Sequence, residues 1–160
     1  MGTLLLPRDN RVVLGARAEE ILGALTGVAL SPEDLQAILT GCVIPASQAT
    51  AGRIHRDGMA SLDLNGGATI YLQRDADRWR VRAATRPGWD IEYPAWRGDF
   101  PETVRLRSRD QRVGVDLAAG ISQVEANVAL APVAFTVDVP DRATPMTLDE
   151  LRNGGPLRGQ

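Results

Sequence analysis

The stretch MASLDLNGGATIYLQ, residues 59–73, decides the fold that the sequence predicts. Residues 59–64 and 68–73 each alternate between apolar and polar side chains, which is the period of a β-strand with one buried face. The Asn-Gly-Gly sequence at 65–67 joins them, and these residue types readily adopt the positive φ angles of tight hairpin turns. The stretch therefore predicts an antiparallel hairpin.

The chain that follows this hairpin has the pattern of further antiparallel strands. Strands are predicted at residues 78–84, 89–96, 101–110 and 113–120. Turn signals separate them at Asp75–Asp77, Pro87-Gly88 and Asp110–Arg112. The stretch GISQVEANVALAPVAFTVDVP, residues 120–140, also alternates, and it predicts one long strand and a last strand at Phe135–Val139. Together these segments predict a meander of about seven strands.

The residues before the hairpin predict two short strands and two short helices. A turn at 7–10 lies between a first strand and a second one at 11–14. Apolar residues recur at helical spacing in 16–26, and Gly27 is placed to end that helix. A second helix is expected after Pro32, which suits the first helical position, and before Gly41.

These elements predict an α+β protein that is mainly β. We expect a curved antiparallel sheet of about seven or more strands, an unclosed half-barrel covered by the two short helices. Residues 1–145 would form this single domain, and residues 146–160 a polar tail with at most one helical turn. Two helices of about ten residues can cover only part of such a sheet, so the sequence predicts an apolar cavity between helices and strands.

The alternation also predicts which side chains share a face of the sheet. Trp79, Val81 and Ala83 would lie on one face, opposite Arg78, Arg80 and Arg82, and a further apolar row would contain Val113, Val115 and Leu117. We interpret the arginine rows at 78–82 and 105–109 as a solvated face rather than as a site for an anionic partner. Asp90 and Glu92 would form cross-strand ion pairs with arginines. The three tryptophans could pack in the core or line a ligand cavity.

The composition argues against several classes of function. The chain has 160 residues and a formal net charge of −2, which gives no general attraction to nucleic acid. His55 is the single histidine and is interpreted as a surface-loop residue, so histidine-based metal sites and catalytic triads lack support. No phosphate-binding or nucleophile motif occurs. We therefore expect no enzyme activity, no metal and no cofactor, and the apolar runs are too short to cross a membrane.

The single cysteine, Cys42, ends the sequence Leu39-Thr40-Gly41-Cys42, which matches a bacterial lipoprotein cleavage box. Such a box needs a preceding apolar run, and here that space contains Ser31, Pro32 and charged residues. We therefore interpret Cys42 as a buried thiol that follows a helix stop.

Four segments resemble one protein family. LTGVALSPEDLQAILTG at 25–41, FPETVRLR at 100–107, ISQVEANVAL at 121–130 and AFTVDVP at 134–140 follow one another in an order that resembles the C-terminal two-thirds of the LolA/LolB-like lipoprotein carriers. The resemblance implies an unclosed antiparallel barrel with helices above a cavity for acyl chains. The N-terminal strands and signal of such carriers are not found here, so we expect a smaller or incomplete barrel.

The resemblance implies non-enzymatic binding of a lipid or an acylated protein, in lipid or lipoprotein trafficking of the cell envelope. We expect a periplasmic or outer-membrane-associated protein if an upstream export signal exists, because none is found in this chain. An alternative is a protein–protein interaction module of an envelope assembly that uses an exposed sheet face or edge. The ligand-binding residues expected by position are Leu22, Leu25, Leu35, Ile38, Leu39, Ile70, Leu72, Trp79, Val81, Trp89, Ile91 and Leu106.

Overall fold

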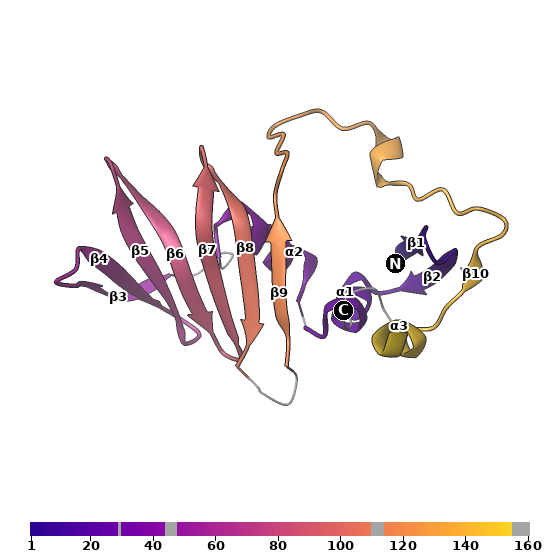
Figure 1. The fold of residues 1–160 in the computed structure, drawn as a ribbon, viewed down its shortest axis with the longest axis horizontal. Helices are drawn as coiled ribbons and strands as arrows, with labels where there is room; N and C mark the ends of the chain where they lie inside the picture. Colours follow the sequence, from indigo (N-terminus) through magenta and orange to yellow (C-terminus); the bar gives the residue numbers. More distant parts are fainter. Residues whose placement is uncertain (29, 44–47, 110–113, 155–160) are drawn as a thin grey trace. The chain divides into compact units, whose positions relative to one another are not determined.

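The structure is a computed structural model that describes residues 1–28, 30–43, 48–109 and 114–154. The chain forms two compact units (Figure 1). One unit combines Met1–Pro32 with Glu125–Gln160, and the other is Glu33–Val124. The boundary expected at residue 145 does not coincide with either unit. No helix of the described residues has the length and apolar character needed to span a bilayer.

The Glu33–Val124 unit contains a seven-stranded antiparallel sheet whose strands follow one another in chain order (Figure 1). The first and last strands are not paired with each other, so the sheet is open, and the expected α+β, mainly β class is confirmed. The predicted turn at 110–112 and Val113 lie outside the described residues. The strands are β3 (Ala49–Ile54), β4 (Met59–Leu64), β5 (Ala68–Asp75), β6 (Arg78–Arg86), β7 (Trp89–Arg97), β8 (Phe100–Ser108) and β9 (Asp116–Gly120).

The register of this sheet places apolar side chains on one face. Ile70, Ala84, Ile91 and Leu106 are consecutive partners across four strands, and the last three are buried. The predicted grouping of Ala83 with Trp79 and Val81 is wrong, because the β5–β6 register shifts at this point: Leu72 pairs with Val81 and Tyr71 with Ala83. The bulge at Arg82 reverses the alternation of β6, so Ala84 takes the apolar face.

One helix, α2 (Pro32–Thr40), covers part of this apolar face. Its residues Ala37 and Ile38 are buried, and Asp34 forms an ion pair with Arg86 of β6 at 2.9 Å. The helix ends at Gly41, whose φ angle of 78° lies in the left-handed region that glycine adopts without strain. Because a helix of nine residues is not stable alone, its attachment to the sheet maintains it.

The other unit has its own small core. β1 (Gly2–Leu6) pairs with β2 (Arg11–Ala16), and β10 (Thr144–Pro145) adds to β2 in parallel. α1 (Ala18–Thr26) and α3 (Leu148–Gly154) complete the unit. The buried cluster consists of Val13, Ile21, Ala24 and Leu151.

Part of the expected polar tail is therefore structured. Thr147 and Glu150 cap the start of α3 reciprocally: the backbone N–H of Thr147 donates to Oε2 of Glu150 at 2.8 Å, and the Glu150 N–H donates to the Thr147 hydroxyl at 3.2 Å. The hydrogen bond from the Thr147 backbone, followed by those that the Thr147 hydroxyl and Arg11 donate to the carboxylate, holds the pKa of Glu150 below its usual value. The cap directs Leu151 of the following turn into the core.

The two strands predicted within residues 120–140 are wrong. β9 ends at Gly120, and the chain beyond it forms no strand up to β10 (Figure 1); it contains only the short 3-10 helix η1 (Pro132–Phe135). Asn127 has a φ of 59°, which interrupts an extended run. Alternation can produce a strand only where a neighbouring strand accepts its backbone hydrogen bonds. The large apolar side chains of the segment stay exposed: Val124, Val128, Leu130, Val133, Phe135 and Val137.

A candidate ligand-binding site at the split between β6 and β7

The sheet opens between two of its central strands. β6 pairs with β7 from Arg86 to Ala83, and the pairing stops there although both strands lie in the described part of the chain. Pro94 stands at this point of β7 and has no N–H to continue the ladder. The first half of β6 therefore pairs with β5 alone, and its backbone toward β7 needs other partners.

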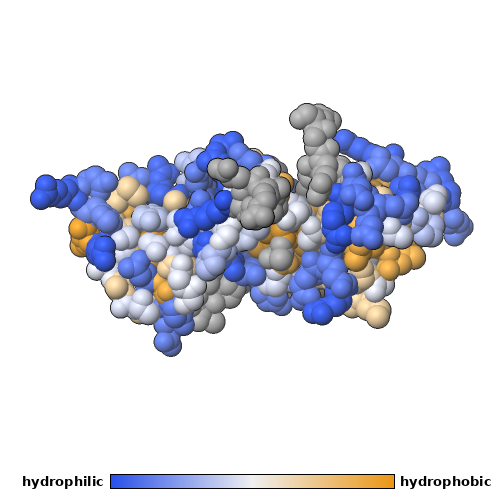
Figure 2. Space-filling view, turned by 90° about the horizontal axis from the view of Figure 1, so that it is seen from below, coloured by the Kyte–Doolittle hydropathy of each residue, from blue (hydrophilic) through white to orange (hydrophobic). Residues whose placement is uncertain are grey.

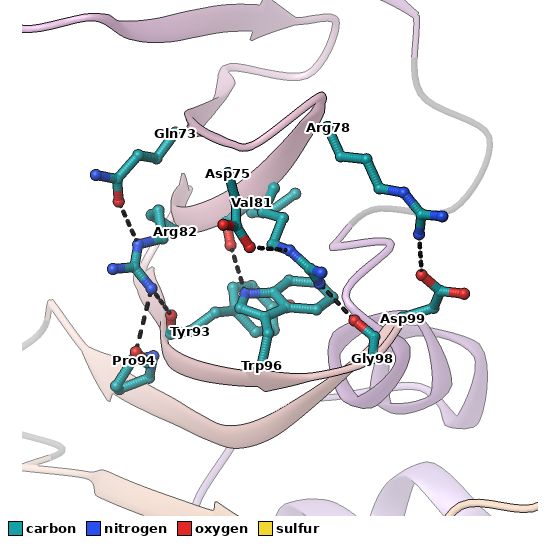
Figure 3. A network of polar contacts seen from close by, with 11 residues as sticks. Gln73, Asp75, Arg78, Val81, Arg82, Tyr93, Pro94, Trp96, Gly98 and Asp99 are labelled. Atoms are coloured by element: carbon teal, nitrogen blue, oxygen red, sulfur yellow. Dashed lines mark hydrogen bonds and ion pairs between the residues drawn. The ribbon is translucent and has the colours of Figure 1, made fainter.

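The indole of Trp96 fills this split. Its Nε1–H donates a hydrogen bond of 3.0 Å to the carbonyl oxygen of Val81, which replaces the missing strand partner (Figure 3). The ring also packs against Tyr93, with centroids 5.7 Å apart and planes tilted by 40°. The Trp96 side chain thus has a fixed position between the two strands.

An arginine from β6 lies against the indole. The guanidinium of Arg80 lies over the Trp96 ring, 5.4 Å from its centroid. Its Nε donates to Oδ2 of Asp75 at 2.7 Å, and its Nη1 donates to the carbonyl of Gly98 at 2.6 Å. Only 20% of the Arg80 side chain is exposed. The prediction that Arg80 belongs to a solvated face is therefore wrong, because its side chain lies between the carboxylate of Asp75 and the ring of Trp96.

The neighbouring arginines are also oriented by hydrogen bonds (Figure 3). Arg82 donates from Nε to Oε1 of Gln73 at 2.7 Å and from Nη1 to the carbonyl of Pro94 at 3.1 Å. Arg78 forms an ion pair with Asp99. Arg82 occupies the bulge of β6, and this position lets its side chain reach both β5 and β7.

Two hollows lie around the split and share Arg80 and Trp96. The first, called here the arginine hollow, has a volume of about 370 Å³ and is lined by Gln73, Arg74, Asp75, Arg80, Arg82, Pro94, Ala95 and Trp96. The second, called the helix-end hollow, has a volume of about 250 Å³ and is lined by Thr40, Gly41, Arg78, Trp79, Arg80, Val81, Trp96 and Asp99. The helix-end hollow lies where α2 ends above β6, and its Trp79 and Val81 share the apolar face of the sheet.

Tyr93 connects this region to α2. It is one of the most deeply buried residues, and its hydroxyl donates a hydrogen bond of 2.9 Å to the carbonyl of Ile38. Burial, and secondarily an electrostatic contribution from the neighbouring Cys42, raise the pKa of the Tyr93 phenol well above its usual value. The phenol therefore remains a neutral donor that attaches the helix to the sheet.

Alkaline pH should weaken this attachment. Because the pKa of Tyr93 is higher in the folded than in the unfolded chain, its contribution to stability is complete below the unfolded value near 10 and is lost as the pH rises above it. We expect the free energy of unfolding to fall as the pH rises above about 10, with a shallower fall in Tyr93→Phe. Urea unfolding of both proteins below and above this pH measures the free energy of unfolding. If it falls equally steeply with pH in Tyr93→Phe and in the wild type, Tyr93 is not the source of the pH dependence.

The residues expected to bind a ligand occupy different positions. Leu22 and Leu25 belong to α1 of the Met1–Pro32 unit, where Leu25 packs on the buried core. Ile38, Ile91 and Leu106 are buried in the other unit. Trp79, 46% exposed, and Val81 line the helix-end hollow. The remaining members are partly buried in α2 or the sheet: Leu35, Leu39, Ile70, Leu72 and Trp89.

Sequence reasoning missed the roles of Trp96, Arg80 and Arg82 in one cleft. The available signals were a proline within a predicted strand and a tryptophan two residues after it. The predicted ion pairs of Asp90 and Glu92 with arginines of the sheet are confirmed: Arg107 pairs with Glu92 at 3.1 Å and Arg109 with Asp90 at 2.8 Å.

Two further side chains were singled out from the sequence. Cys42 was expected to be buried but is exposed, because the chain reverses at Gly41 and places Val43 in the interior instead. His55 is exposed in the turn between β3 and β4, as expected, and its Nε2 lies 2.9 Å from Oγ of Ser61. Within the described residues, no group of three or more metal-ligating side chains is placed to hold an ion.

Comparison with known proteins gives no relative. No model of a known protein family, no curated protein and no solved structure matches the chain.

Proposed function

We propose that this protein binds a lipid or an acylated protein without catalysing its conversion, in lipid or lipoprotein trafficking of the cell envelope. The observation that carries the proposal is the helix-end hollow, which lies between the end of α2 and the apolar face of an open sheet. Trp79 and Trp96 line it, and aromatic rings bury large areas with little loss of conformational entropy. In a carrier of this kind the chain would act in the periplasm or at the outer membrane.

The energetics of acyl-chain burial suit such a site. Each methylene removed from water contributes about 0.8 kcal/mol. Because association itself costs several kcal/mol, a ligand gains measurable affinity only when many of its methylenes are buried. On the face drawn in Figure 2, the surface is mostly hydrophilic and its hydrophobic residues form separate small patches. The helix-end hollow differs from such patches because Trp79, Val81 and Trp96 border it together, beside charged residues.

Trp79→Ser should weaken the binding of a sixteen-carbon fatty acid about tenfold, because the substitution removes one aromatic wall of the hollow. Its stability should change little, since nearly half of the Trp79 side chain is exposed. Calorimetric titration measures the affinity, and urea unfolding checks the stability. Ile54→Ser is the matched control, because Ile54 is an exposed apolar residue at 80% on β3 and does not line the hollow.

Equal affinities of Trp79→Ser and the wild type would place the acyl chain elsewhere. If no fatty acid or phospholipid binds the wild-type protein, the interaction module becomes the better proposal. The observation that favours this second function is the exposed apolar segment from Val124 to Val137, which contains Phe135 at 76% exposure. An apolar segment of this kind is typical of a surface that another protein covers.

A further inference from the structure

We propose that the arginine hollow is a subsite for a phosphate group, the head group of the ligand whose apolar part occupies the helix-end hollow. Three arginines and one aspartate line the arginine hollow, so its charged side chains carry two net positive charges (three minus one). A phosphate carries a charge between −1 and −2 near neutral pH. The charge of the hollow therefore matches one phosphate group.

The positive charge is not neutralised inside the protein. Nε of Arg74 donates to the backbone carbonyl of Ala76, and Arg82 donates to the amide of Gln73 and the carbonyl of Pro94. These acceptors are neutral. Within the described residues, neither Arg74 nor Arg82 has a carboxylate at ion-pair distance, whereas Arg80 has Asp75. Two of the three cations thus remain available to an anion.

The arginines are also oriented before any ligand arrives. Arg82 uses Nε and Nη1 on two strands, which fixes the plane of its guanidinium and leaves Nη2 for an incoming oxygen. Arg80 is held by Asp75, Gly98 and the Trp96 ring. A fixed planar donor binds phosphate oxygens with little loss of side-chain entropy. This feature separates the arginine hollow from the ion pairs on β8, whose arginines have carboxylate partners.

The size of the hollow indicates what is attached to the phosphate. A volume of about 370 Å³ is more than a phosphate ion needs, and the helix-end hollow adjoins at Arg80 and Trp96. A phosphate ester with an apolar group that occupied both hollows would pass beside the Arg80 and Trp96 side chains, which form their common wall. The assignment of the hollow as a head-group subsite rests on the proposed lipid-binding function. Recognition of a phosphate by the arginines applies to free phosphate as well.

The experiment compares four probes by calorimetric titration of the full chain. Dihexanoyl phosphatidic acid carries the phosphate and short acyl chains, dihexanoyl glycerol carries the same chains without phosphate, and glycerol 3-phosphate and inorganic phosphate carry no acyl chain. We expect phosphatidic acid to bind at least about tenfold more tightly than dihexanoyl glycerol, because a hydrogen bond to a charged group contributes at that level. Added salt should weaken this preference.

Arg82→Gln should remove most of the preference for phosphatidic acid while the affinity for dihexanoyl glycerol stays the same. Arg105→Gln is the matched control: Arg105 lies on the same sheet, is ion-paired to Asp116 and does not line the hollow. Its preference should equal that of the wild type. Arg74→Gln provides a second test, because Arg74 is exposed and its loss should not affect folding.

The outcomes separate the subsite from the lipid-binding function. The subsite is overturned if the wild type binds phosphatidic acid and dihexanoyl glycerol equally. It is also overturned if both Arg82→Gln and Arg74→Gln keep the wild-type preference for phosphatidic acid. Either outcome leaves the lipid-binding function intact. A different outcome is that inorganic phosphate or glycerol 3-phosphate binds, that Arg82→Gln abolishes this binding, and that acyl chains add no affinity. This outcome supports the subsite and overturns the lipid-binding function.

Discussion

Gly41→Ala should lower the free energy of unfolding of the Glu33–Val124 unit by about 3 kcal/mol. A methyl group at this position would lie 2.4 Å from Cη2 of Trp96, and Pro101 stands close by at 3.3 Å. The indole must move out of the split, and overpacking of this kind costs about 1–3 kcal/mol. The φ angle of 78° adds the left-handed penalty of a residue with a Cβ, about 1–2 kcal/mol. Urea unfolding followed by circular dichroism measures the loss.

A matched variant separates the two contributions. Gly67 also has a positive φ, 77°, but a methyl group added there in Gly67→Ala would meet no atom within 4 Å. It should lose only the backbone part, about 1 kcal/mol. Gly41→Ala should also shift the fluorescence of the displaced Trp96 and weaken ligand binding in both hollows. If the two variants lose the same stability, Trp96 does not fill the split as described.

Leu151→Ala should destabilise the other unit by about 3 kcal/mol. The side chain is fully buried among Val13, Ile21 and Ala24, and truncation of a buried leucine leaves a cavity. α3 has seven residues, so it has little stability of its own and depends on this contact. Urea unfolding, together with hydrogen exchange of the β1 and β2 amides, measures the effect.

Leu14→Ala is the control for this prediction. Leu14 lies on β2 but is 57% exposed, so its truncation should change stability by less than about 0.5 kcal/mol. A loss in Leu151→Ala as small as in this control would mean that residues 146–154 behave as the polar tail expected from the sequence. A selective loss of protection in β1 and β2 supports the observed core.

The predictable part of the fold consists of elements encoded by neighbouring residues. The hairpin at 59–73 and the helix that ends at Gly41 follow from period-two alternation and turn or cap glycines. The same signals failed at 120–140, where an alternating pattern found no partner strand. They also failed at Arg82, because a bulge has no pattern in the sequence and reverses all later assignments on the strand.

The candidate site was less predictable than the fold. Trp79 and Val81 were named for their apolar character and do line the helix-end hollow. Arg80 and Arg82 were assigned to a solvated face because a regular alternation turns them outward. The missing ladder at Pro94 instead opens the sheet, and Trp96 enters the gap beside Arg80.

The sequence by itself determined the local geometry of this protein: its turns, its helix ends and the open mainly-β architecture. These depend on the φ preferences of glycine and proline and on the spacing of apolar side chains, which act over a few residues. Only the tertiary structure decided the split in the sheet, the arginine hollow and the burial of Leu151. These depend on which backbone groups and side chains find partners far away in the chain, and a local pattern does not encode that choice.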